Sequence, residues 1–80
     1  MFKAFVYRID AVETADAVNF EVRIEFRFLN PASPSTNLLT FTAPWGSDWR
    51  LMAKSAIQDW ATTALGETVD GVVFPDLTTI

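Results

Sequence analysis

The most regular pattern in the chain is a strict alternation of apolar and polar residues over positions 18–28, VNFEVRIEFRF. A period of two is that of a β-strand, whose successive side chains point to opposite faces of a sheet. The apolar face of this segment consists of Val18, Phe20, Val22, Ile24, Phe26 and Phe28. The charged residues on the other face alternate in sign: Glu21, Arg23, Glu25 and Arg27. The pattern predicts a strand with one buried and one solvated face.

Two more segments are predicted to be strands beside this one. Residues 3–12 are rich in aromatic and β-branched types, and residues 38–43 read LLTFTA. In the first segment Phe5, Tyr7 and Ile9 are expected on the core face, and in the second Leu39 and Phe41. The stretch 30–37, with two prolines among small polar residues, is predicted to be a loop. Short connections favour an antiparallel meander.

The charges predict a register for the first two strands. Pairing Ile9 with Phe20 sets Arg8 opposite Glu21, whereas a shift of two residues sets Arg8 opposite Arg23. Unlike pairs directly opposite each other contribute about 0.2–1 kcal/mol, and like pairs are destabilising. We therefore expect the first register. It leaves three apolar side chains of the first strand on the face away from the helix: Phe2, Ala4 and Val6.

The period changes to about 3.6 over residues 47–65, which predicts an amphipathic helix. Ser47 is the expected N-cap and Gly66 the expected left-handed C-terminal residue. Trp49 and Trp60 lie on the apolar stripe and are expected to pack on the central strand. The rest of that stripe is Met52, Ala53, Ala56, Ile57, Ala64 and Leu65.

The tail, residues 67–80, is predicted to be an arm or a short edge strand, because Pro75 follows the strand-like VVF and bars a central position. The expected fold class is α+β: a three-stranded antiparallel meander packed on one helix, with a fourth edge strand as an option. We divide the chain into a domain of residues 1–66 and a tail of residues 67–80.

Composition removes several classes of function. With no cysteine and no histidine among 80 residues, the chain has no disulfide, no thiolate or imidazole ligand for zinc, and no Ser-His or Cys-His pair. Glu21 and Glu25 lie about 13 Å apart along a strand, which is too far for a glycosidase pair. We expect no catalytic residues, no metal, no cofactor and no enzymatic activity.

The same composition restricts the partners. The net charge is −4 and the six basic residues are scattered, which disfavours nucleic acid. No apolar stretch is long enough to span a membrane, and the first ten residues lack the pattern of a signal peptide. A small scaffold without disulfides or metal usually gains stability from oligomerisation. We therefore expect a homo-oligomer.

The apolar residues in excess of one small core are the candidates for an interface. They are Phe2, Val6, Trp45, Val72, Val73, Phe74 and Leu77. Trp45, just before the helix, has two interpretations: a staple on the first helical turns, or an interface anchor. The charged face formed by Arg8, Glu21, Arg23, Glu25 and Arg27 is interpreted either as a solvated sheet face or as a polar recognition surface.

The layout KAFVYRIDAVE…VNFEVRIEFRF…LLTFTAP…DWRLMAKSAIQDWA resembles that of small virion-associated proteins of tailed bacteriophages. Such proteins often combine a β-hairpin or meander with one amphipathic helix, and they decorate capsids or form head–tail and tail parts. The resemblance is one of pattern, and it assigns no role to individual residues. It implies a virion component present in many copies; outside that context the cytoplasm is the expected location.

Two hypotheses of function follow from these observations. The first is a structural protein that packs in multiple copies on itself or on other structural proteins of a particle. The second is a small acidic inhibitor or binding module that blocks the surface of a partner protein. Its contacts would be Asp10, Asp16, Glu21 and Glu25.

Overall fold

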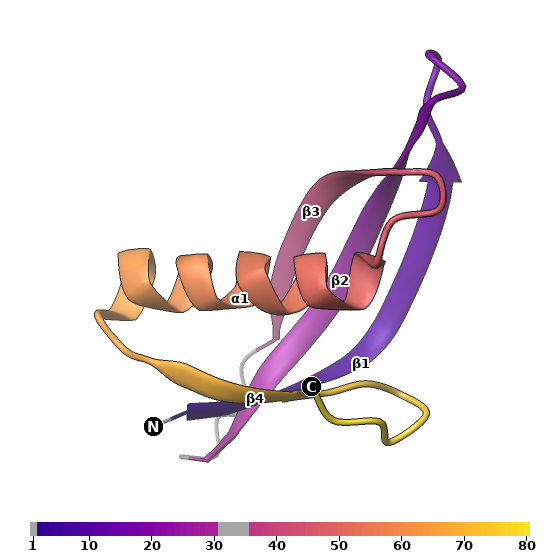
Figure 1. Ribbon diagram of the computed structural model, residues 1–80. Coiled ribbons are helices and arrows are strands. Elements are labelled where there is room, and N and C mark those ends of the chain that lie inside the picture. Colours follow the sequence, from indigo (N-terminus) through magenta and orange to yellow (C-terminus); the bar gives the residue numbers. More distant parts are fainter. Residues whose placement is uncertain (1, 31–35) are drawn as a thin grey trace.

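A computed structural model describes residues 2–30 and 36–80 of the chain. The elements follow in the order β1 (Phe2–Glu13), β2 (Asn19–Asn30), β3 (Asn37–Pro44), α1 (Trp49–Leu65) and β4 (Val69–Val73). The strands form one sheet in the order β3-β2-β1-β4, and α1 lies across one face of it (Figure 1). Most of the loop predicted at 30–37 falls outside the described residues.

The first three strands form the predicted antiparallel meander, and the tail adds the fourth strand. β1 pairs with β2 and β2 with β3 in antiparallel fashion, whereas β4 pairs with β1 in parallel. A parallel pair needs a long crossover, and α1 provides it by carrying the chain from β3 at one margin of the sheet to β4 at the other. The α+β fold class predicted from the sequence is therefore confirmed.

The apolar face of β2 forms the centre of the core, as predicted. Its side chains from position 20 to position 28 are all buried: Phe20, Val22, Ile24, Phe26 and Phe28. Val18 precedes the strand and is 64% exposed, so the buried face begins at Phe20. Trp60 of α1 packs edge-to-face on Phe26, with ring centroids 5.5 Å apart.

A β-bulge at Tyr7 divides β1 into two halves of opposite phase. Val6 lies opposite Phe26 and Arg8 lies opposite Glu25, so Tyr7 is an extra residue with no partner in the ladder. Ala4 and Val6 before the bulge are fully buried on the helix side. The prediction that they face away from the helix is therefore wrong. After the bulge the odd-numbered positions turn toward the core, where Ile9 lies opposite Ile24.

The predicted register of β1 and β2 is also wrong. Ile9 pairs with Ile24 rather than with Phe20, which is a slip of four residues along β2. The observed register also sets unlike charges opposite each other, because Arg8 faces Glu25 and Asp10 faces Arg23. Charge alone therefore does not distinguish the two registers. The observed register contains the bulge, which buries Ala4 and Val6 and also sets Ile9 opposite Ile24.

The N-cap of the helix lies one residue later than predicted, and the helix ends at Leu65 as predicted. Asp48, not Ser47, is the N-cap: its carboxylate accepts a hydrogen bond from the Leu51 amide at 3.4 Å. Ser47 instead donates its hydroxyl proton to the Pro44 carbonyl at 2.6 Å. Gly66 takes the left-handed conformation at the C-terminal end.

The buried stripe of the helix is Ala53, Ile57 and Ala61, and small side chains at two of these positions let the helix approach the sheet closely. Ala64 and Leu65 are exposed.

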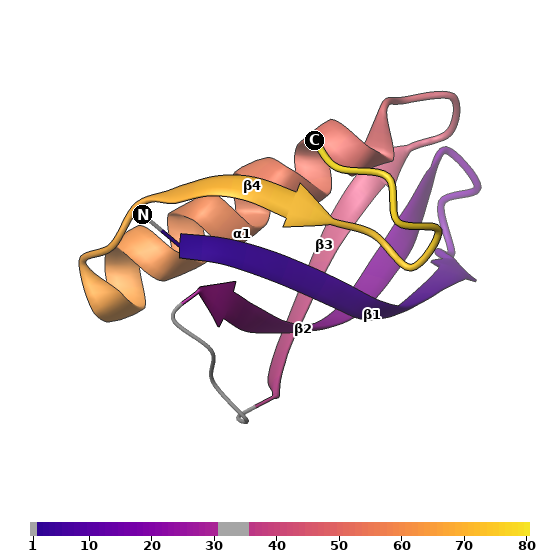
Figure 2. The ribbon, with the colours of Figure 1, turned by 90° about the horizontal axis from the view of Figure 1, so that it is seen from below.

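The tail folds back on its own chain. Within β4, the Val72 amide donates to the Ile80 carbonyl, and the Ile80 amide donates to the Val72 carbonyl, both at 3.0 Å. The Phe74 amide donates to the Thr78 carbonyl at 2.9 Å. Figure 2 shows this final segment turning back beside β4. Val72 and Phe74 of the tail are thus buried within the chain, whereas Leu77 at its turn is exposed.

An ion pair joins the turn of the tail to the helix. Arg50 of α1 approaches the Asp76 carboxylate at 2.7 Å, and the Thr78 amide donates to the same carboxylate at 3.1 Å. The hydrogen bonds from Thr78 and Arg50 lower the pKa of Asp76 to about 2. Arg50 also lies over the rings of Trp49 and Phe74.

We predict that the tail loosens in acid. Because the pKa of Asp76 is lower in the folded chain than its ordinary 3.8, the stabilisation is fully present above about pH 4. It is lost as the pH falls through about 2. An NMR titration of the Thr78 amide should show a transition near pH 2, and Asp76→Asn should remove it. A transition at the ordinary carboxyl pKa would contradict this pairing.

Candidate functional site

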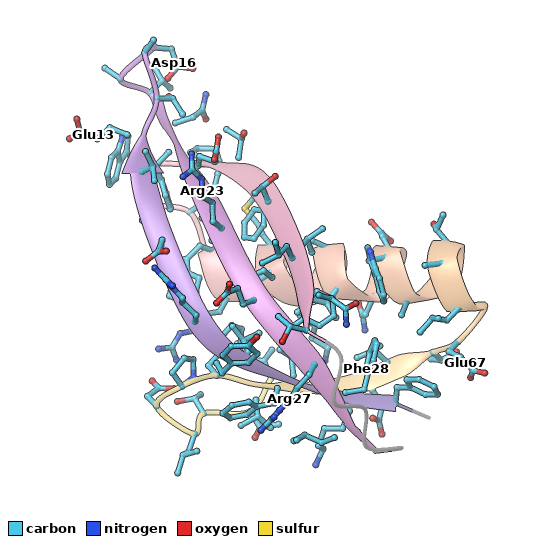
Figure 3. All side chains as sticks on the ribbon, turned by 180° about the vertical axis from the view of Figure 1, so that it is seen from behind. Glu13, Asp16, Arg23, Arg27, Phe28 and Glu67 are labelled. Carbon is cyan, nitrogen blue, oxygen red and sulfur yellow. The ribbon has the colours of Figure 1, made fainter. Side chains whose placement is uncertain are left out.

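The sheet face away from the helix carries the predicted charged residues. Figure 3 views this face and labels Arg23 and Arg27. Arg8 and Asp10 on β1 lie opposite Glu25 and Arg23 on β2, so the ladder of alternating charges lies where the sequence predicts it, in the shifted register. Leu38, Thr40 and Thr42 of β3 lie opposite Glu25, Arg23 and Glu21.

The ion pairs on this face run along the strands rather than across them. Arg8 pairs with Asp10 at 3.3 Å, and Arg23 pairs with Glu21. The Arg27 guanidinium lies 5.9 Å from the centre of the Tyr7 ring. The paired side chains are between 37% and 64% exposed, and exposed pairs contribute little to stability. Each acid that has a basic neighbour along its strand is partly neutralised, so this face presents no concentrated charge.

The seven residues predicted to form an interface divide into three groups. Val6, Val72 and Phe74 are buried in the core of the chain. Phe2 and Val73 are partly buried, and the Phe2 ring packs edge-to-face on Phe28 with centroids 5.0 Å apart. Trp45 and Leu77 are 56% and 75% exposed. Of the set, only these last two present most of their side chain to solvent.

An apolar groove of about 450 Å³ lies beside Trp45. Its floor is the helix-side face of the β1–β2 hairpin, and its wall is the segment that joins β3 to α1. Figure 1 shows the tip of this hairpin projecting beyond the helix. The lining residues are Ile9, Ala11, Phe20, Val22, Trp45, Gly46, Ser47 and Trp49.

The loop before the helix holds Trp45 over the hairpin. The Trp45 amide donates to the Val18 carbonyl at 3.1 Å, which extends the β2–β3 ladder by one pair. The Trp45 ring stacks at a tilt on Phe20, with centroids 4.8 Å apart. Gly46 then adopts a φ of +83°, a conformation that glycine reaches without steric cost. The aromatic contact of Trp45 is therefore with β2, which differs from a staple on the first helical turns.

The chemistry of the groove is that of apolar binding. The only side-chain hydroxyl in its lining is that of Ser47, which already donates to Pro44. Within residues 2–30 and 36–80, no group of three or more His, Cys, Asp or Glu side chains gathers where a metal ion could be held. A half-exposed tryptophan beside an apolar hollow is typical of protein-binding surfaces.

Sequence reasoning missed most of the groove. Ile9 and Ala11 line it only because the bulge turns the second half of β1 toward the helix side. The sequence hides this change of phase, because Phe5 and Tyr7 continue the row of apolar residues at odd positions that includes Ile9 and Ala11. No break in the apolar pattern of β1 therefore marks the position of the bulge.

Comparison of the chain with known protein families, with curated proteins and with solved structures finds no significant match. The described part of the chain contains no helix that is both long and apolar enough to cross a membrane.

We predict that two of the tryptophans differ sharply in their contribution to folding. Trp60→Ala removes a ring packed on Phe26 and Phe28, and should lower the free energy of unfolding by about 3 kcal/mol or more. Trp45→Ala removes a half-exposed ring and should cost less than about 1.5 kcal/mol. Urea unfolding followed by circular dichroism measures both. Equal losses would show that Trp45 belongs to the core rather than to a binding surface.

Proposed function

We propose that this chain is an assembly protein that packs in multiple copies on itself or on a larger lattice. The observation that carries the proposal is the apolar surface left over once the core is complete. Trp45 stands over an open groove of about 450 Å³ and is 56% exposed. Leu38 and Leu77, on other parts of the surface, are 70% and 75% exposed. A chain of this size gains stability when such residues are covered by another subunit.

The pattern resemblance to virion-associated proteins of tailed bacteriophages suggests which kind of particle this is. We propose a capsid-decorating, head–tail or tail component, whose partners are copies of itself and other structural proteins. The compact sheet with one helix suits that role, because its described chemistry consists of apolar surfaces and neutralised charges rather than of a reactive cluster.

The alternative, an acidic binding module, has weaker support. Asp16 accepts hydrogen bonds from the Thr14 hydroxyl at 2.6 Å and from the Val18 and Asn19 amides at 3.0 Å. These bonds, that of Thr14 first, hold the pKa of the Asp16 carboxyl well below its ordinary value. Asp16 is thus engaged in the hairpin turn. Asp10 and Glu21 are each paired with an arginine on their own strand.

The proposal predicts a mass that rises with protein concentration. Light scattering of the purified chain between about 1 μM and about 1 mM should show species larger than the 8.9 kDa monomer. Because apolar burial drives the association, raising the salt concentration should not dissociate them. Sedimentation of a native extract should place the chain with a large particle. A monomer at every concentration that also sediments alone would contradict the proposal.

A further inference from the structure

The two edge strands of the sheet, β4 and β3, differ in whether another segment of the chain pairs with their outer side. At the β4 margin, the tail returns and pairs with the strand through the Val72, Phe74 and Ile80 amides. β4 is also short, with five residues. Both features protect a sheet edge from pairing with another chain. The tail thus closes this margin within one copy.

The β3 margin is open within the described residues. The bond from the Trp45 amide to the Val18 carbonyl fixes which residues of β3 bond to β2. In an antiparallel ladder bonded pairs alternate, so Ala43, Phe41 and Leu39 direct their backbone groups to β2. The residues between them direct their amides and carbonyls outward: Leu38, Thr40 and Thr42. None of the described residues pairs with that outer side.

β3 also lacks the features that usually protect an edge. Its eight residues, NLLTFTAP, contain no charged side chain, and the only proline is the last residue. Its pairing with β2 runs from Asn37 to Pro44 without a bulge. A long, regular, uncharged and largely apolar edge strand is a ready template for another strand.

The hydrophobic core is incompletely covered at the β3 margin. The core-facing residues of β2 opposite this strand are buried, whereas Leu39 and Phe41 on the core face of β3 are only partly buried. A strand added beside β3 would cover these two side chains. Its own core face must be apolar to do so, and its charge must be low. β3 itself has both properties. Although each chain carries a net charge of −4, β3 contains no charged residue, so two β3 strands can approach each other without repulsion between like charges on the strands.

We propose that β3 pairs with β3 of a second copy, antiparallel and around a two-fold axis close to Thr40, giving one continuous eight-stranded sheet. Thr40 then lies opposite its counterpart, and Leu38 lies opposite Thr42 of the other copy. These three bonded pairs exchange about six backbone hydrogen bonds. A two-fold interface of this kind is self-complementary and closes after two copies. The inference rests on the proposed function and names the surface through which the copies meet.

Substitution of Thr40 tests the pairing. Thr40→Lys brings two lysines opposite each other at the axis and should weaken self-association by about tenfold or more. Thr62→Lys is the matched control, because Thr62 is an exposed residue of α1 away from the edge, and it should associate like the parent. Light scattering gives the mass, and circular dichroism verifies the fold. Thr40→Pro is a second variant, in case the lysine disturbs β3 beside Arg23. Proline is tolerated on an edge strand and removes the outward amide of residue 40, so it should also weaken self-association.

A single cysteine tests the register, since the parent has none. Bonded residues opposite each other have Cα atoms about 5.5 Å apart, which is within disulfide range. Thr40→Cys should therefore form a covalent dimer on mild oxidation, and Thr62→Cys should not. A parent that self-associates while Thr40→Lys and Thr40→Pro keep its mass would overturn the edge pairing and leave the proposed function standing. A parent that stays monomeric at every concentration would overturn the pairing and self-assembly together.

Discussion

The bulge at Tyr7 is the constraint on which the rest of the structure depends. β1 has twelve residues and one face under the helix, and its core-facing residues change from even positions, as far as Val6, to odd positions from Ile9 onward. A regular strand could not place both Val6 and Ile9 on the side of the helix, because an even and an odd position point to opposite faces. One unpaired residue restores the phase, so that Val6 packs in the core and Ile9 lies opposite Ile24. The register, the position of the charges and the floor of the groove all follow from it.

Local periodicity was sufficient to predict the elements. The period of a segment shows directly which of its faces is apolar. The buried faces of the strand from Phe20 to Phe28 and of the helix around Ile57 could therefore be predicted from the alternation within each segment. Gly66 likewise marks the end of the helix through its own backbone preference. The N-cap was misassigned by one residue, because Ser47 and Asp48 are both good caps and the hydroxyl of Ser47 is used by Pro44.

The features that sequence reasoning missed all depend on contacts between distant segments. The register could not be decided from charge, since unlike residues face each other in both alternatives. The tail is predicted to be an arm or an edge strand, and its return along β4 is made by backbone hydrogen bonds of Val72, Phe74 and Ile80. An ion pair between residues 26 positions apart joins its turn to the helix. The groove required Trp45 from one connection and Ile9 from the far side of the bulge. Within residues 2–30 and 36–80, the result is a sheet closed at β4 and open at β3, a difference that follows from strand order rather than from any one segment.

Nuclear Overhauser contacts between the backbone protons of β1 and β2 test the bulge most directly. With the bulge at Tyr7, Ile9 should show cross-strand contacts to Ile24, and Ala4 to Phe28, while Tyr7 has no residue directly opposite. Contacts that join Ile9 to Phe20 and Arg8 to Glu21 would instead indicate an unbroken strand. In that case Ala4 and Val6 would lie on the outer face, and both the core and the groove described above would be wrong.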